Sequence, residues 1–238
     1  MADLLQDMPD SDVYDVFARI NTYSVVLKAQ ELRNARWFGD FKTSVYSLAN
    51  EFVTFWEENR IFSSKQILRM AEAELVSELL IAINDGIREG QKSVIDNFYE
   101  KNDDVFPRRE AHEKRFKQTI DAIGAIFGDD LAQSRLRATR LFYPMFCAVY
   151  HLKFQLPKFT HKRVPLKVAD FPKAKVALLN VDVLLDRIAE AEDNNEEIEL
   201  ARAERRFYDA YSEHWVHADK RSVMAAYLCN ALVTAIDE

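Results

Sequence analysis

The sequence is poor in the residues that interrupt regular structure. Glycine occurs 5 times and proline 6 times in 238 residues, and so few turn formers cannot punctuate a many-stranded sheet. Alanine, leucine, glutamate, lysine and arginine, which favour helices, recur throughout the chain. We therefore predict an all-α fold, a multi-helix bundle of roughly eight to ten helices that surrounds one core or is bilobed.

Cysteine is also scarce, and no leader is recognisable. Cys147 and Cys229 both lie in apolar stretches, where a thiol is usually a small buried hydrophobe. This usage predicts reduced core cysteines rather than a disulfide framework. The first residues, MADLLQDMPDSD, lack the basic and apolar regions of a signal peptide. We expect a cytoplasmic protein.

Long apolar runs and a surplus of positive charge are both missing. The most apolar stretch, residues 141–152, is too short to cross a bilayer and contains Pro144 and His151. It predicts a helix buried on most sides, which Pro144 should kink or split. The net charge is −7, so bulk charge does not indicate nucleic-acid binding. No membrane partner is expected.

Apolar residues at helical spacing predict the elements before residue 155. Val13 to Ile20 form a first stripe, and a longer stripe runs from Phe38 to Phe55. Ser63 and Gln66 form a capping box before a helix that should end near Gly86. Three more helices are expected: a short one from Ser93 to Tyr99, one with a core stripe that ends at Gly128, and one capped by Asp129 or Asp130 that continues through Arg140. The core stripe consists of Phe116, Ile120, Ile123 and Phe127.

The clearest interruption lies at residues 155–172, which contain Pro157, Pro165 and Pro172. We predict an ordered loop there, between a helical lobe at residues 1–154 and a three-helix portion at residues 173–238 that packs on it. The first of these three helices is marked by Val176, Leu179, Val183 and Leu184.

A resemblance to a known family lies near the start, in the segment VFARINTYSVVLKAQELRNA, residues 16–35. The residues that carry it are Phe17, Arg19, Asn21, Leu27, Gln30, Glu31, Arg33 and Asn34. The segment resembles the helical C-terminal half of the ParB-like, GmrS-type (DGQQR-motif) family of restriction and anti-phage defence proteins. Gly39 followed by Phe41 also suits that family, so the specific likeness covers about 25 residues of the chain.

The resemblance implies a partner that this sequence does not contain. In the family, a ParB-like α/β domain carries the DGQQR-type motif, which is linked to nucleotide hydrolysis and, in some members, to DNA nicking. The only Asp-Gly pair here is Asp85-Gly86, in a helical context, so no catalytic residue is assigned. An NTP and a divalent metal are implied only for the missing domain. No activity is expected of this chain alone.

Two functions follow as expectations. The first is a non-catalytic helical domain that supports a ParB-like nucleotide-hydrolysing or nuclease half, in cis or in trans, with DNA as a possible contact. The second is a helical protein–protein interaction scaffold with no nucleic-acid role. The sequence leaves the oligomeric state open.

The polar residues of the family-like segment allow two interpretations. Asn21, Gln30, Glu31, Arg33 and Asn34 either close one side of a nucleotide site, as the resemblance implies, or cap and lock the junction between the helix at Asp12 and the helix at Phe38. Glu31 and Arg33 point to different sides of a helix and cannot pair with each other. The structural role is favoured, because buried polar networks mostly serve structure.

A basic stretch is the candidate nucleic-acid contact. Its members are Lys158, Lys162, Arg163, Lys167 and Lys173, with Phe159 among them. Basic residues interleaved with aromatic ones can bind a phosphate backbone. A solvated loop that balances the acidic helices is the favoured alternative, since the chain as a whole is acidic.

The remaining residue patterns give only weak functional signals. His214 and His217 lie near Asp219, but this spacing nominates no third ligand, so a role at a helix terminus is favoured over a metal site. We predict no metal site. The sequence also lacks a G-x-S-x-G elbow and a glycine-rich phosphate loop.

Overall fold

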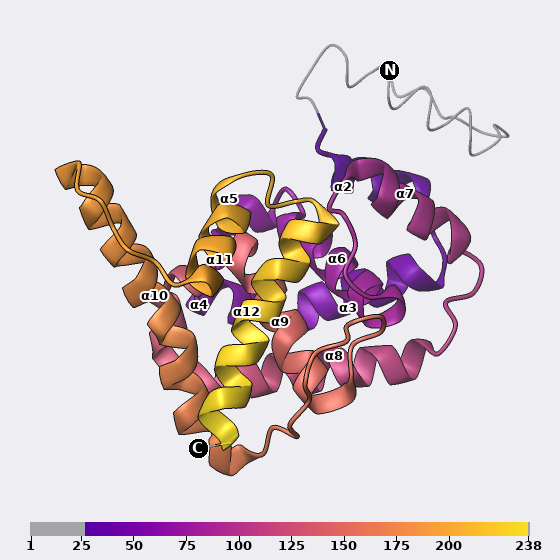
Figure 1. Ribbon diagram of the computed structural model, residues 1–238. Helices are drawn as coiled ribbons and strands as arrows, with labels where there is room; N and C mark the ends of the chain where they lie inside the picture. Colours follow the sequence, from indigo (N-terminus) through magenta and orange to yellow (C-terminus); the bar gives the residue numbers. More distant parts are fainter. Residues whose placement is uncertain (1–26, 238) are drawn as a thin grey trace, which may run out of the picture.

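The computed structural model describes residues 27–237, and within them every regular element is helical (Figure 1). The all-α prediction is confirmed. The first seven α-helices are α2 (Ala29–Arg36), α3 (Asp40–Glu51), α4 (Val53–Glu58), α5 (Ser64–Ile67), α6 (Ala71–Asp85), α7 (Lys92–Lys101) and α8 (Arg109–Phe127). The remaining four are α9 (Thr139–Phe154), α10 (Phe171–Asn194), α11 (Arg202–Ser212) and α12 (Ala218–Asp237).

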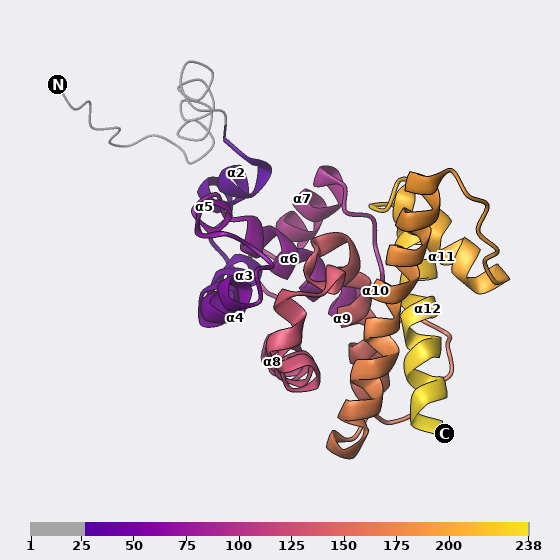
Figure 2. The ribbon, with the colours of Figure 1, turned by 90° about the vertical axis from the view of Figure 1, so that its left-hand side faces the viewer.

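The helices share one continuous core. Helix α9 lies centrally, packed on α8 and α6 on one side and on α12 on the other. Its residues 141–152 are all buried, as their composition predicts. Buried apolar side chains connect Phe41 on α3 through Phe142 on α9 to Val233 on α12. The helices after residue 170 therefore pack on the earlier part through α9 and α8 (Figures 1 and 2).

Several predicted helices are confirmed in position. The core stripe of α8, Phe116, Ile120, Ile123 and Phe127, is fully buried, and α8 ends at Gly128, whose φ is 56°. Helix α6 ends at Gly86, with a φ of 86°. Glycine adopts these positive φ values without the penalty that a Cβ would bring.

Two predicted helices are broken. The helix expected from Ser63 to Gly86 divides into α5 and α6, because Met70 adopts a left-handed conformation with a φ of 59°. The capping contact itself is present, since Oε1 of Gln66 accepts from the Ser63 amide at 2.9 Å. Residues 128–137 form two 3₁₀ turns, η1 (Gly128–Ala132) and η2 (Arg135–Arg137), instead of a helix that continues into α9.

Pro144 does not divide α9, which is continuous from Thr139 to Phe154. Proline removes one amide donor, and the affected carbonyl is that of Arg140, in the first turn of the helix. Pro144 and its neighbours are buried on all sides, so packing holds the helix together across this position.

Helix α10 differs from the prediction in where it begins and in which of its faces is buried. It begins at Phe171, so Pro172 lies in its first turn, where proline is favoured. The helix buries Ala177, Val181 and Leu184. Val176 and Val183, predicted to mark the apolar stripe, are 62% and 57% exposed. The buried stripe is therefore displaced around the helix from the one that the valines suggested.

Cys147 and Cys229 are both buried and free, as predicted. Among residues 27–237, no helix combines the length and the apolar character needed to cross a membrane.

Candidate functional site

Helix α2 contains the Gln-Glu-Leu-Arg-Asn part of the family-like segment. It begins after Lys28, whose amide donates to Oε2 of Glu31 at 2.5 Å, an acidic first-turn contact that also suits the helix dipole. Gln30 and Arg33 are three residues apart and share one face. That face is turned inward, with Gln30 only 1% and Arg33 only 2% exposed.

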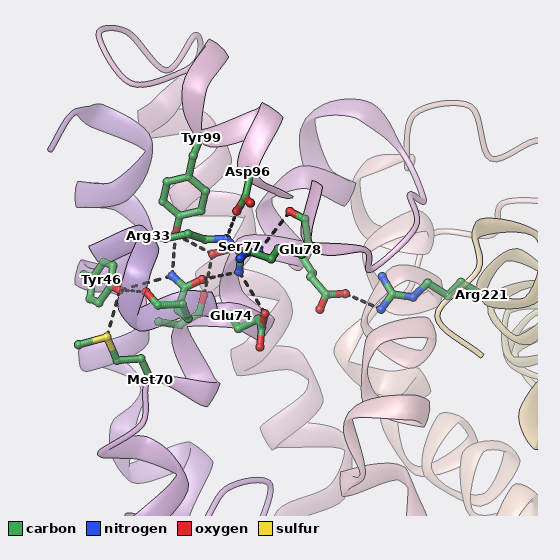
Figure 3. A network of polar contacts seen from close by, with 12 residues as sticks. Arg33, Tyr46, Met70, Glu74, Ser77, Glu78, Asp96, Tyr99 and Arg221 are labelled. Carbon is green, nitrogen blue, oxygen red and sulfur yellow. Dashed lines mark hydrogen bonds and ion pairs between the residues drawn. The ribbon is translucent and has the colours of Figure 1, made fainter. Parts of the chain in front are cut away.

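Gln30 connects α2 to α3 and α7. Its amide nitrogen donates to the Tyr99 hydroxyl at 2.8 Å, and to the more distant Tyr46 hydroxyl at 3.4 Å (Figure 3). Its amide oxygen accepts from Nη1 of Arg33 at 3.1 Å. Every polar atom of this buried side chain is therefore used, as burial requires.

Arg33 is the centre of the cluster. Its Nε donates to Asp96 on α7 at 2.7 Å, and its Nη1 donates to Glu74 on α6 at 3.1 Å (Figure 3). Its Nη2 donates to the backbone carbonyl of Lys92 at 3.3 Å. A planar guanidinium with donors on three sides suits this task, and a lysine could not replace it. Arg33 thus ties α2 to the two helices beneath it.

Tyr99 extends the cluster into α6. Its hydroxyl lies 2.9 Å from Oγ of Ser77, which donates to the carbonyl of Ala73 at 2.7 Å. Burial raises the pKa of Tyr99 to about 12, although its hydrogen bonds to Ser77 and Gln30 act in the opposite direction. Tyr99 is therefore a neutral hydroxyl that donates and accepts hydrogen bonds.

The other polar residues of the segment lie outside this cluster. Glu31 faces the opposite way and pairs with Arg69 at 2.7 Å, so the prediction that Glu31 and Arg33 do not pair is confirmed. Asn34 contributes its backbone carbonyl, which accepts from Lys42 at 2.9 Å. The prediction for Asn21, and the helix expected at residues 13–20, lie outside the described residues.

A second buried ion pair lies further along α6. Glu78 contacts Arg221 of α12 at 2.5 Å, with exposed side-chain fractions of 15% and 3% (Figure 3). The Arg221 guanidinium also lies 4.2 Å from the centre of the Tyr143 ring. A Cβ at Gly90 would come within 2.3 Å of the Arg221 guanidinium, so a larger residue there would displace that side chain. Burial raises the pKa of Glu78, against the lowering effect of Arg221.

We call the cluster of Gln30, Arg33, Glu74, Asp96 and Tyr99 the polar junction. Its side chains hydrogen-bond to one another, which leaves few groups available for chemistry. The donors of Arg33 and Gln30 are directed to groups of the same chain. No group of three His, Cys, Asp or Glu side chains that could hold a metal ion occurs in the described part of the chain. The geometry suits the locking of α2 onto α6 and α7.

Two of the five predicted nucleic-acid contacts are engaged elsewhere. The guanidinium of Arg163 donates to the carbonyls of His151 at 3.1 Å and Lys153 at 2.9 Å, at the end of α9. A cation in this position satisfies carbonyls that a helix end leaves unpaired. The ammonium of Lys162 pairs with Asp237, near the end of α12. These two side chains hold the loop against the helices.

The other three predicted contacts, Lys158, Lys167 and Lys173, are exposed. They belong to separate segments, since Lys158 precedes the middle of the loop and Lys173 lies on α10. The amide of Lys167 donates to Asp170 at 2.8 Å. No contact brings these three lysines together within residues 27–237.

The histidine pair lies in the turn before α12. The His214 and His217 rings are 5.4 Å apart and nearly parallel, and the His217 carbonyl accepts from the amide of Arg221 in the first turn of α12. His217 therefore occupies the helix-terminus position that the sequence favours.

Sequence reasoning missed the partners of the polar junction. Glu74, Asp96 and Tyr99 lie 41, 63 and 69 residues from the α2 side chains that they contact, and no local pattern marks them. The pair of Glu78 and Arg221 was missed as well. Glu78 and Arg221 lie 143 residues apart, and no local pattern marks them as a pair.

Comparison with known proteins gives no assignment: no family model, curated protein or solved structure matches this chain. The likeness of residues 16–35 to the GmrS-type family therefore stays a prediction. The function has to be argued from the geometry of the chain itself.

Proposed function

We propose that this chain is the non-catalytic helical domain of a GmrS-type, modification-dependent restriction or anti-phage defence protein. It supports a ParB-like nucleotide-hydrolysing or nuclease half, in cis or in trans, in the cytoplasm. The observation that carries the proposal is the burial of Gln30 and Arg33. These two side chains of the family-like segment hold α2 against α6 and α7 through polar contacts.

The physical argument is that a rigid support fixes the position of a catalytic half. A flexible attachment would leave a catalytic half free to move against the helical body, whereas α2 is tied to α6 and α7 by charge-assisted hydrogen bonds. Glu31 and Asn34 lie on the other sides of α2. In this proposal α2 is the rigid base against which the ParB-like half rests, and NTP and metal are bound by that half.

The test begins with the DNA that precedes the coding sequence. We expect it to encode a ParB-like half with a DGQQR-type motif, and we expect that half to co-purify with a tagged copy of this chain and to hydrolyse NTP in the complex. The matched variants are Glu31→Gln on α2 and Glu57→Gln on α4. Slower turnover with the first variant alone supports the proposal, whereas a missing motif and no co-purified ParB-like half contradict it.

DNA contact is a separate part of the proposal. Lys158, Lys167 and Lys173 are the remaining exposed candidates. Replacing two of them, Lys167 and Lys173, with glutamate should weaken an electrophoretic shift more than replacing Lys65 and Lys101, which are also exposed. Binding through phosphates should fall steeply with salt. No shift at low salt, or equal loss in both double variants, excludes this loop as a DNA contact.

The second candidate function is the interaction scaffold with no nucleic-acid role. One observation favours it, the open apolar groove between α10 and α12. A scaffold would bind its partner without NTP, and binding would not depend on a ParB-like half.

A further inference from the structure

A groove of about 1110 Å³ lies between α10 and α12. The two helices are in contact, and Figure 1 shows them close together at the start of α10 and the end of α12 and diverging from there. Ala203 and Glu204, at the start of α11, line it as well. The groove is remote in sequence from the polar junction, and the opposite face of α10 is packed on the core.

The walls of the groove are apolar although they are open to solvent. Val176 and Val183 on α10 are 62% and 57% exposed, and both line the groove. The facing wall on α12 presents small side chains, Ala231 and Ala235, beside the ring of Tyr227. Exposed apolar side chains gathered in a groove are typical of a binding surface.

The spacing along α10 fits a helical occupant. Lys173, Val176, Asn180, Val183 and Arg187 all line the groove, and their separations of three or four residues place them on one face of α10. The span from Lys173 to Arg187 is roughly 21 Å at about 1.5 Å per residue. Two helical walls with ridges of side chains form a seat for a third helix of about four turns.

The charged residues of the groove indicate which charge the bound helix carries beside its apolar stripe. Lys173 and Arg187 stand at the two ends of the α10 wall, and neither forms an ion pair or hydrogen bond with another residue of the described part of the chain. Glu204 is the one acidic residue among the lining side chains. Its carboxylate accepts from the Ala201 amide at 2.9 Å, at the start of α11. Two unpaired cations therefore remain to meet an occupant.

We propose that the groove between α10 and α12 binds an amphipathic α-helix of a partner protein, with acidic residues beside its apolar stripe. The apolar stripe packs against Val176 and Val183, and the acidic residues meet Lys173 and Arg187. Lys173 was predicted as a nucleic-acid contact, but the exposed valines beside it on the same face have no role against a phosphate backbone.

The probe is a labelled designed peptide of 18 residues (about five turns), with leucine at helical spacing and glutamate on both flanks. A second peptide carries lysine in place of every glutamate. Fluorescence anisotropy with the full chain should show saturable binding of the acidic peptide and binding about tenfold weaker for the basic one, because complementary charge sets specificity.

Three variants assign the binding to the groove. Val183→Asp should weaken the acidic peptide about tenfold or more, because a carboxylate replaces an apolar anchor. Val105→Asp, at a valine that is 64% exposed elsewhere, should leave binding unchanged. Arg187→Glu should shift the preference towards the basic peptide. Thermal unfolding of each variant confirms that it is folded.

The contrary outcomes are equally specific. Equal binding of the two peptides, or binding that Val183→Asp does not weaken, overturns the proposal. Sedimentation of the chain alone tests one other occupant: a dimer that Val183→Asp dissociates and Val105→Asp does not would show that a second copy fills the groove. A shift of plain DNA that Val183→Asp leaves intact and Arg187→Glu abolishes would assign the surface to nucleic acid instead.

Discussion

The interior beneath α2 and the outer face of α10 depart from ordinary burial in opposite ways. At the polar junction a guanidinium is 2% exposed and is paired on three sides. In the groove, valines are more than half exposed. Charges are usually outside and valines inside. The buried guanidinium finds all its partners within the chain, which indicates a structural role. The exposed valines are not covered by the chain, which indicates a surface for a partner.

The largest expected effect concerns the second interior pair. Arg221→Ala leaves the carboxylate of Glu78, which is 15% exposed, without its cation. We expect the free energy of unfolding to fall by about 3 to 5 kcal/mol, as for other broken buried pairs, measured by urea unfolding. The control is Lys162→Ala, which removes an exposed pair with Asp237 and should cost about 0 to 1 kcal/mol. Equal losses would mean that burial does not distinguish the two pairs.

Arg33→Ala should have a somewhat smaller effect on stability. Its partners Glu74 and Asp96 are 42% and 29% exposed, so both carboxylates can be hydrated when the guanidinium is removed. We expect a loss of about 3 kcal/mol, mainly from Gln30 and the Lys92 carbonyl left without donors. Lys117→Ala, at an exposed pair with Glu51, is the control. A loss no larger than the control's would remove the locking role of α2.

The interior should also respond to pH through His112. This side chain is 4% exposed, its Nε2 lies 3.2 Å from Oδ1 of Asn84, and burial, with Arg108 and Arg115 nearby, lowers its pKa from 6.5 to about 4. The unfolded chain therefore binds a proton at higher pH than the folded chain does. Stability that is present above pH 6.5 is lost as the pH falls towards 4.

The expected loss from His112 is about 2 kcal/mol across that interval, which is below the full conversion of the pKa difference. Urea unfolding at a series of pH values measures it. His112→Phe, which cannot titrate, should show a shallower decline than the unmodified chain. Parallel pH profiles would mean that His112 is not protonated on unfolding in this range.

The smallest effect on stability is expected in the groove. Val183→Asp should change the free energy of unfolding by less than about 0.5 kcal/mol, because the side chain is already in water. Val181→Asp, two residues away and 1% exposed, should unfold the protein or cost several kcal/mol (roughly the burial of an unpaired charge). A large loss with Val183→Asp would show that the groove wall belongs to the core.

The sequence predicted the helices best where one face is continuously apolar. The stripe of α8 and its end at Gly128 were both found, because helical periodicity and a glycine stop are local signals. The breaks at Met70 and in residues 128–137 were missed, since a left-handed residue and 3₁₀ turns are selected by how neighbouring helices pack. Pro144 was overestimated, because burial on all sides outweighs one lost hydrogen bond.

The candidate site was predicted in part. Polar crowding in the Gln-Glu-Leu-Arg-Asn segment predicted a junction between the helices at Asp12 and Phe38, and the Asp12 helix lies outside the described residues. Arg33 instead joins α2 to α6 and α7. The basic stretch was less informative: Arg163 and Lys162 look like free cations in the sequence but cap a helix and pair with Asp237. The sequence around a lysine or arginine does not show whether its side chain is free or is engaged in a helix cap or an ion pair.

The sequence by itself determined the helical class, the core of α8, the reduced cysteines and the polar character of α2, because each follows from residues close together in the chain. Only the tertiary structure decided which face of α10 is buried and which valines remain in water. It also decided that Arg33 meets Glu74 and Asp96, and that Arg221 meets Glu78. The physical reason is that burial and charge pairing depend on which helices become neighbours, and contacts across 41 to 143 residues leave no periodic trace in the sequence.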